Sequence, residues 1–234
     1  APAFSAIAPL FPPSHANFST AFKLRQTALG LGARGAERHA LWLAAITPDM
    51  MHDLVGPALR EGVAFALDAA RESARGTRSD LDAATAFYLR VYLGEGVLQK
   101  VDRATMRVSL EARAPLLDTE VVEFCLALDH RYKLRRGRTK WLMRRALAPL
   151  VPKAITERPK KGFGAPVGQW LRGPLRDLLR DTLSPARLAR GGWFDPGPVT
   201  RWIDEHLAGR VDHRKALYTL LVLEHWRTRW LEAP

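Results

Sequence analysis

Long apolar runs, paired cysteines and a conventional leader are what this sequence lacks. Its 234 residues contain no apolar run of eighteen or more, so we expect no segment to cross a membrane. The opening stretch, APAFSAIAPLFPP, has neither a positively charged start nor an unbroken apolar core, and we do not interpret it as a signal peptide. The single cysteine excludes an internal disulfide and a multi-cysteine metal cluster. This cysteine usage favours a reducing, cytoplasmic setting.

Several stock motifs of nucleotide and metal chemistry are missing as well. The chain has no G-x-x-x-x-G-K-[ST] phosphate loop, no H-E-x-x-H and no C-x-x-C. It also lacks the alternation of strands and helices that an all-parallel α/β fold requires. The cysteine itself, Cys125, lies in the apolar stretch VVEFCLAL, where we expect it to pack as a small hydrophobe rather than to act as a nucleophile.

Positive charge is abundant and uneven. The formal net charge is +12 at pH 7, and residues 131–145 hold eight lysines and arginines and no acid. Such a block is typical of a solvated face or of a surface that meets a polyanion. Nucleic acid, nucleotide phosphates and an acidic protein surface all remain open as partners on charge alone.

The spacing of apolar residues predicts a mainly α fold with few strands. Residues 1–20 are Pro-rich and are expected to form an irregular lead-in, whereas Thr47, Ser79 and Asp118 or Thr119 are expected to cap helices. We expect Gly94 and Gly96 to interrupt the helical pattern. The expected helical ranges are 21–45 with a break near 30–35, a helix from Thr47 through Leu59, 61–74, 80–93, 97–110, 119–128, 138–149, 169–171, 174–183, 196–208 and 213–231.

The most informative stretch is LQKVDRATMRVSLEARAPLLD, residues 98–118. Helical spacing predicts a buried apolar stripe, formed by Val97, Val101, Ala104 and Val108, beside a cationic edge formed by Lys100, Arg103 and Arg107. The helix is expected to end where Glu111 and Arg113 precede an Ala-Pro pair, because the residue before proline is pushed out of the α region. We interpret this stretch as one wall of a site that binds phosphate.

A second cationic segment, ERPKKGFG at residues 157–164, brackets Lys160 with proline and glycine. Glycine permits close approach of the backbone to a ligand, and a lysine ammonium suits phosphoryl oxygens as a compact charge. Read by itself, the segment fits a flexible basic surface loop better. Together with residues 98–118 and 131–145, however, it favours a pocket for a polyphosphate.

In this order the motifs resemble the C-terminal part of the synthetase domain of glutamine-dependent asparagine synthetases. The resemblance is strong over residues 79–230 and weaker over 20–78, and it depends on the combination rather than on any one motif. The matching segments are KVDRA at 100–104, SLEARAPLLD at 109–118, Gly137-x-x-Lys140, RPKKGFG at 158–164, WLRGPL at 170–175 and Leu223-Glu224-x-Trp226.

The resemblance implies the helical C-terminal portion of an adenine-nucleotide α-hydrolase-like (PP-loop ATP pyrophosphatase) α/β synthetase domain. Such enzymes use ATP and Mg²⁺ to convert aspartate into a β-aspartyl-adenylate, and ammonia from glutamine then displaces AMP. Lys160 aligns with the family's essential lysine, which contacts the phosphates and the activated intermediate. Arg103 occupies a position where relatives carry Lys or Arg that binds pyrophosphate oxygens. We therefore expect Lys160 and Arg103 to be the catalytic residues.

Four further residues are weaker candidates for binding substrate or ATP: Lys100, Asp102, Glu111 and Arg113. Asp102, Glu111 and Arg113 match the family pattern, but a buried Glu111–Arg113 pair that fixes the turn is the interpretation we favour. Lys161 is often apolar in relatives and receives no role. No metal ligand is assigned within these residues.

The departures from the family pattern matter equally. The Ser-Gly-Gly-x-Asp-Ser loop that grips ATP, the acidic Gly-Glu-Gly-Gly-Asp-Glu segment and the glutaminase with its leading cysteine are absent from the sequence. We therefore expect residues 21–234 to be the C-terminal part of a longer ligase, inactive alone, with a split subunit less favoured. The full-length protein could form a homodimer.

Two further interpretations stay open. Within the family, a β-lactam-forming, peptide-cyclising or polysaccharide-linked amidotransferase would share these motifs. Outside it, the basic block could belong to a helical nucleic-acid-binding module, but such a module should show stacking aromatics or a recognition helix. Only Tyr132 and Trp141 lie there, and we favour the ligase.

Overall fold

A computed structural model describes residues 20–56, 59, 65–159 and 164–232. The predicted lead-in at 1–20 lies almost entirely outside this range. The chain divides into two compact units, residues 1–99 with 164–234 and residues 100–163, which we call unit 1 and unit 2. Both units are mainly helical, as the sequence predicts.

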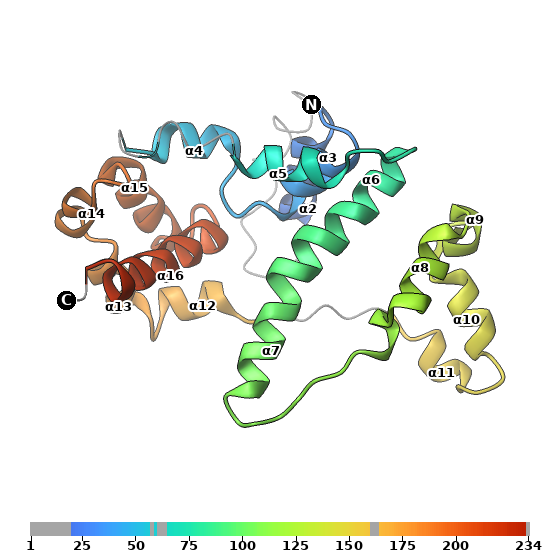
Figure 1. The fold of residues 1–234 in the computed structure, drawn as a ribbon. Helices are drawn as coiled ribbons and strands as arrows, with labels where there is room; N and C mark the ends of the chain where they lie inside the picture. Colours follow the sequence, from blue (N-terminus) through green and yellow to red (C-terminus); the bar gives the residue numbers. More distant parts are fainter. Residues whose placement is uncertain (1–19, 57–58, 60–64, 160–163, 233–234) are drawn as a thin grey trace. The chain divides into compact units, whose positions relative to one another are not determined.

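The described part of unit 1 contributes helices from both ends of the chain (Figure 1). Its N-terminal elements are α2 (Thr20–Gly30), α3 (Gly35–Leu43), α4 (Pro48–Leu54), α5 (Phe65–Ser73), α6 (Asp80–Phe87) and a π-helix, η3 (Tyr88–Leu98). Its C-terminal elements are α12 (Val167–Arg172), α13 (Arg176–Thr182), α14 (Pro185–Gly191), α15 (Pro196–Leu207) and α16 (Arg214–Trp230).

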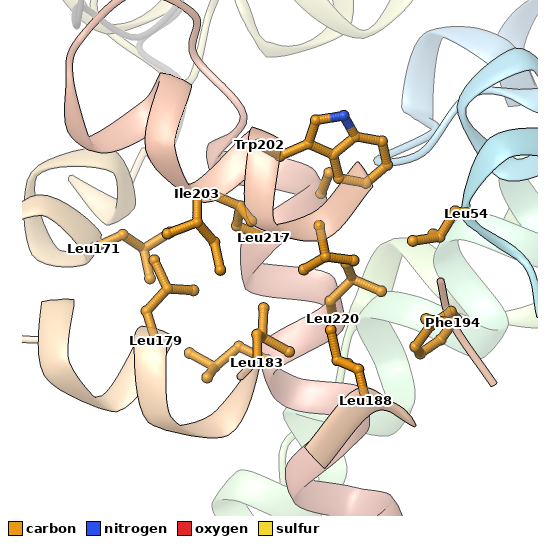
Figure 2. Packing of buried hydrophobic residues seen from close by; sticks show 13 residues of the cluster. Leu54, Leu171, Leu179, Leu183, Leu188, Phe194, Trp202, Ile203, Leu217 and Leu220 are labelled. Carbon is orange, nitrogen blue, oxygen red and sulfur yellow. The ribbon is translucent and has the colours of Figure 1, made fainter. Parts of the chain in front are cut away.

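Two apolar clusters hold unit 1 together. In the larger one, leucines of α12, α13 and α14 meet Trp202 and Ile203 of α15 around Leu217 and Leu220 of α16 (Figure 2). Full burial of one such leucine stabilises the fold by about 1.5–3 kcal/mol. A smaller cluster joins α3, α5 and α6 through Ala36, Ala70, Ala83 and Phe87. Unit 1 therefore has a conventional close-packed interior.

A buried histidine lies beside the larger cluster. His206 is fully buried, and its Nδ1 is 3.7 Å from a carboxylate oxygen of Asp212. Burial lowers the pKa of the His206 imidazole, and the negative charge of Asp212 opposes this effect. His213, seven residues on, instead contacts Glu205, with 2.6 Å between Nε2 and Oε2. Each of the two histidines therefore lies beside a carboxylate of its own unit.

Unit 2 consists of short elements (Figure 1). It contains α7 (Gln99–Met106), a 3₁₀ turn η4 (Pro115–Leu117), α8 (Thr119–Ala127), α9 (His130–Lys133), strands β1 (Leu134–Arg135) and β2 (Arg138–Thr139), α10 (Trp141–Leu147) and α11 (Lys153–Thr156). The two strands form an antiparallel hairpin in which Arg135 pairs with Arg138. Arg136 and Gly137 make its tight turn, both with positive φ.

The predicted caps are confirmed. Thr47 Oγ1 accepts a hydrogen bond from the Met50 amide at 3.4 Å, and Ser79 Oγ accepts one from the Asp82 amide at 3.1 Å. Asp118 caps α8, because its Oδ1 accepts a bond from the Glu120 amide at 3.0 Å. No described helix is long and apolar enough to cross a membrane.

Several predicted boundaries are wrong. The helix expected from Thr47 through Leu59 ends at Leu54, after which Val55 is extended. Gly94 and Gly96 do not break the chain out of helical structure, since residues 80–106 are helical throughout, but both lie in the π-helix η3 that separates α6 from α7. A mid-helix glycine costs only about 1 kcal/mol relative to alanine, which neighbouring turns can offset. The helix expected at 138–149 begins at Trp141, because the Arg136-Gly137 turn commits residues 134–139 to a hairpin. Between the helices expected at 174–183 and 196–208, where no helix was expected, Pro185 starts α14 (Pro185–Gly191), since a proline at the first helical position loses no hydrogen bond.

Candidate functional site

Cations line one side of α7. At about 100° per residue, Arg103 lies about 60° from Lys100 around the helix axis, and Arg107, the first residue after α7, would lie about 20° from Lys100 if the helix continued. All three residues are exposed, and no ion pair joins them to another residue in the described ranges. Arg103 lies in the last turn of α7, where the helix dipole favours positive charge. The predicted cations are thus exposed, and no carboxylate of the described residues forms an ion pair with them.

The apolar stripe predicted beside these cations is not buried. Val101 is 37% and Val108 74% exposed, and Ala104 is also exposed. The prediction of a buried face was therefore wrong for this chain. The spacing correctly groups apolar residues on one side of α7, but burial also requires a surface to cover them, which sequence periodicity does not supply.

The end of α7 is set by its own backbone rather than by the distant Ala-Pro pair. The Ser109 amide donates to the Met106 carbonyl at 3.1 Å, and the Leu110 amide donates to the Thr105 carbonyl at 3.1 Å. Ser109 itself has φ +58°. Those two hydrogen bonds around a left-handed residue form a Schellman motif. The motif turns the chain away from the helix axis directly after the cationic edge.

Replacing Ser109 with glycine should therefore stabilise the end of α7. A left-handed conformation costs a non-glycine residue about 1–2 kcal/mol. Glycine removes this cost, but its greater conformational entropy in the unfolded chain offsets part of the gain. We expect Ser109→Gly to raise the free energy of opening at the Ser109 and Leu110 amides by about 0.5–1 kcal/mol. Hydrogen exchange followed by NMR measures this change. Ser109→Ala is the matched control and should give no gain; equal protection in both variants would contradict the interpretation.

Glu111 and Arg113 are brought together, but on the surface. Arg113 Nη2 lies 2.9 Å from Glu111 Oε1, and the two side chains are 83% and 67% exposed, arginine first. The prediction that the Glu111–Arg113 pair is buried is therefore wrong, although the ion pair itself is present. An exposed ion pair contributes about 0–1 kcal/mol, so the pair is a weak device for fixing the turn. Asp102 is exposed on α7, about 160° around the axis from Lys100.

Lys160 lies outside the described residues, but the start of its loop is described. Glu157 Oε1 is 3.5 Å from Arg138 Nη2, which links the residue before Arg158-Pro159-Lys160 to strand β2. Within the described part of the predicted site residues, Glu111–Arg113 is the one pair in contact.

The basic hairpin contributes cations that the site prediction left out. Lys140 has φ +56° immediately before α10, an uncommon conformation for a residue with a side chain. The guanidinium groups of Arg135 and Arg145 lie 4.7 and 5.4 Å from the centre of the Trp141 ring. The tight turn could have been found from Gly137 flanked by short β-type dipeptides. Lys140 belongs to the Gly137-x-x-Lys140 match, but nothing in the sequence predicts its left-handed backbone.

The chemistry of these groups suits phosphate oxygens better than a metal ion. Guanidinium and ammonium groups donate charge-assisted hydrogen bonds to phosphate. By contrast, no group of three or more His, Cys, Asp or Glu residues gathers anywhere in the described ranges, and Mg²⁺ requires oxygen ligands. The cations of the described residues could therefore donate hydrogen bonds to the oxygens of a phosphate group.

One glycine-rich stretch has the spacing of a dinucleotide-binding motif but not its structural context. GLGARG at 30–35 has the G-x-G-x-x-G spacing of a dinucleotide-binding turn, but it joins α2 to α3. The dinucleotide fingerprint requires a strand before the first glycine. This stretch is therefore a connection between two helices.

Comparison with known proteins identifies a family model and several curated relatives. The model described as asparagine synthase matches residues 12–228. A Mycobacterium tuberculosis protein described as a putative glutamine-hydrolysing asparagine synthetase is 38% identical over 145 residues. The aligned stretch covers 62% of this chain and 22% of that protein. Asparagine synthetase 1 of Bacillus subtilis is 26% identical over 64% of this chain and 23% of its own length. Asparagine synthetase 1 of Saccharomyces cerevisiae is 30% identical over 44% of this chain and 20% of its own length. No solved structure matches.

Proposed function

We propose, because the chain belongs to the asparagine synthase family, that it supplies the helical C-terminal part of an ATP-dependent amide ligase. The chain spans less than a quarter of the length of the curated relatives named above. The activity proposed below therefore belongs to the complete protein, by which we mean the whole product of the gene that encodes these residues. The observation that carries the proposal is the family match over 12–228, which includes the unpaired cations of α7 and the Lys160 loop.

The proposed reaction has two steps. A side-chain carboxylate oxygen of aspartate attacks the α-phosphorus of ATP, which forms a β-aspartyl-adenylate and releases pyrophosphate. Ammonia derived from glutamine then attacks the acyl carbon, the bond from carbon to the bridging oxygen breaks, and AMP leaves. Mg²⁺ is expected with the nucleotide, and we derive no step through it from this chain.

Charge stabilisation is the part of the chemistry that this chain can supply. In the first step negative charge accumulates on the leaving pyrophosphate. Fixed cations aimed at that charge stabilise the transition state more than the ground state. We assign Arg103 to the pyrophosphate oxygens and Lys160 to the phosphates and the activated intermediate. Lys100, Glu111, Arg113 and Asp102 remain supporting candidates, of which Lys100 shares the cationic edge.

The nucleic-acid alternative has little support from the geometry of the basic block. Sequence-tolerant binding of single strands relies on aromatic faces on which bases stack. Two arginine guanidiniums already lie over Trp141, and Arg131 lies over Tyr132 at 5.8 Å. Neither ring is presented as a free platform. Within the family, β-lactam-forming, peptide-cyclising and polysaccharide-linked relatives differ from an asparagine synthetase in the acceptor, which the assay below separates.

The proposal is tested by ATP–pyrophosphate exchange, which reports reversible adenylate formation. The complete protein should incorporate labelled pyrophosphate into ATP when aspartate is added, and the 234-residue chain alone should not. Exchange by the 234-residue chain would show that the remaining part is dispensable. Exchange that depends on another carboxylic acid would keep the adenylation and replace aspartate as the substrate.

A further inference from the structure

The corner between α15 and α16, within unit 1, encloses a histidine whose polar atoms are not satisfied. His206 lies in the last turn of α15 and is fully buried. Neither of its ring nitrogens has a hydrogen-bond partner among the described residues. A buried polar group without a partner costs free energy, and a buried charge costs more unless it is paired. The corner is therefore built to hold the imidazole in its neutral form.

The carboxylate beside His206 is already bound by another cation. Asp212 Oδ1 lies 3.7 Å from His206 Nδ1, which is longer than a hydrogen bond. The same carboxylate accepts hydrogen bonds from the Arg214 amide at 3.1 Å and from Arg214 Nε at 2.6 Å. Because a guanidinium binds Asp212 so closely, the carboxylate attracts a second positive charge on His206 less strongly.

Other groups around His206 act on its charge from both directions. Burial is the largest effect and opposes protonation, whereas Asp212 favours it. The Arg172 guanidinium on α12 repels a positive charge on His206, and so does His213 when it is charged. The backbone of Gly168 and the dipole at the C-terminal end of α15 favour that charge. The combined effect lowers the pKa of the His206 imidazole below its ordinary value.

A small number of local contacts closes the corner. The Gly209 amide donates to the His206 carbonyl at 3.1 Å, and the Arg210 amide donates to the Glu205 carbonyl at 2.9 Å. The Glu205 carboxylate also lies 2.6 Å from His213 Nε2. Breaking these contacts would admit water to His206 while the leucines of the larger apolar cluster stay packed. Local opening is therefore a less costly way to solvate a charged imidazole than unfolding of unit 1.

We propose that His206 makes the α15–α16 corner sensitive to pH: the neutral imidazole keeps the corner closed, and protonation opens it. In the open corner the imidazole is solvated and has a pKa near its ordinary value of about 6.5, whereas in the closed corner this pKa is lower. The open form therefore takes up the proton first as the pH falls. The closed corner is most stable above about pH 7 and loses stability as the pH falls through about 6.5. This regulation goes beyond the proposed ligase activity and does not depend on it.

Hydrogen exchange in the complete protein, followed by mass spectrometry at about pH 7.5 and about pH 5.5, tests the proposal. Rates are corrected for the intrinsic effect of pH on amide exchange. Peptides that cover residues 204–217 should then be about three- to tenfold less protected at the lower pH, because the open form binds up to one more proton. His206→Gln does not titrate, so its protection should be equal at the two pH values. His225→Gln removes an exposed histidine of α16 and, as the matched control, should keep the full change.

A second measurement needs no variant and decides the question if His206→Gln does not fold. Exchange of the imidazole C2 hydrogens in the unaltered complete protein, read by mass spectrometry against pH, gives a titration midpoint for each histidine. The midpoint of His206 should lie below that of His225. A midpoint equal to or above that of His225 would overturn the proposal. An equal loss of protection in the unaltered protein and in His206→Gln would overturn it as well, as would disappearance of that loss in His225→Gln.

Discussion

Lys160→Ala in the complete protein is expected to lower aspartate-dependent ATP–pyrophosphate exchange by about 10²–10³-fold. Removal of one preorganised group that stabilises developing charge typically has an effect of this size, equivalent to about 3–4 kcal/mol of transition-state stabilisation. The lysine is proposed to contact both the phosphates and the activated intermediate. Its loss should therefore affect the rate of exchange as well as the affinity for ATP. Glutamine hydrolysis should continue, because that reaction uses a separate site.

Lys161→Ala is the matched control for this variant. Lys161 has the same charge, the next position in the chain and no assigned role, so its removal should change exchange by less than about threefold, as expected for a solvated cation. Near-normal exchange in Lys160→Ala would remove that residue from the mechanism. Equal losses in both variants would indicate a general effect of loop charge rather than a specific contact.

Arg103→Ala is expected to produce the second largest loss, about 10²-fold in exchange, with a raised apparent KM for pyrophosphate. An exposed guanidinium with no described carboxylate partner can donate charge-assisted hydrogen bonds to pyrophosphate oxygens. Arg103→Lys should retain most of the activity, because a lysine keeps the charge and relatives are expected to carry either residue there.

Arg107→Ala distinguishes a specific contact at Arg103 from a general positive field. Arg107 directly follows α7, about 40° from Arg103 if the helix is continued by one residue, and is also exposed. Its removal should lower exchange by less than about fivefold, and added salt should weaken that smaller effect further by screening. If Arg103→Ala and Arg107→Ala had the same effect, the assignment of Arg103 would fail.

The local features of this fold were predictable because they depend on neighbouring residues. Thr47, Ser79 and Asp118 cap helices through hydrogen bonds to amides two or three positions away, and such contacts are encoded within one turn of chain. The final helices, α15 and α16, also follow the apolar spacing closely, because their apolar faces are buried in the unit 1 core.

Features that depend on distant or absent surfaces were not predictable. The periodicity of α7 and α8 identifies their apolar sides, but it does not predict that Val101 and Cys125 are exposed. Similarly, the match of Glu111 and Arg113 to the family pattern predicts that they matter, and their contact is present. It does not reveal that the pair is on the surface, since burial is a property of the whole assembly.

The candidate site shows the same division. The sequence places Lys100, Arg103 and Arg107 on one side of a helix; in the structure Lys100 and Arg103 lie on α7 and Arg107 directly follows its last residue. It does not reveal that Ser109 ends the helix, because a left-handed serine is uncommon and the Schellman hydrogen bonds involve only backbone atoms. Which cations meet one ligand also depends on Lys160, which remains a prediction from the sequence.

The most direct test of the account is the fate of oxygen in the first chemical step. The complete protein is supplied with aspartate labelled with ¹⁸O in the side-chain carboxylate, ATP and glutamine, and the products are analysed by mass spectrometry. If the carboxylate attacks the α-phosphorus, one labelled oxygen must appear in AMP when ammonia displaces it. Label in inorganic phosphate instead, or amide formation with no label in AMP, would contradict the proposed adenylate.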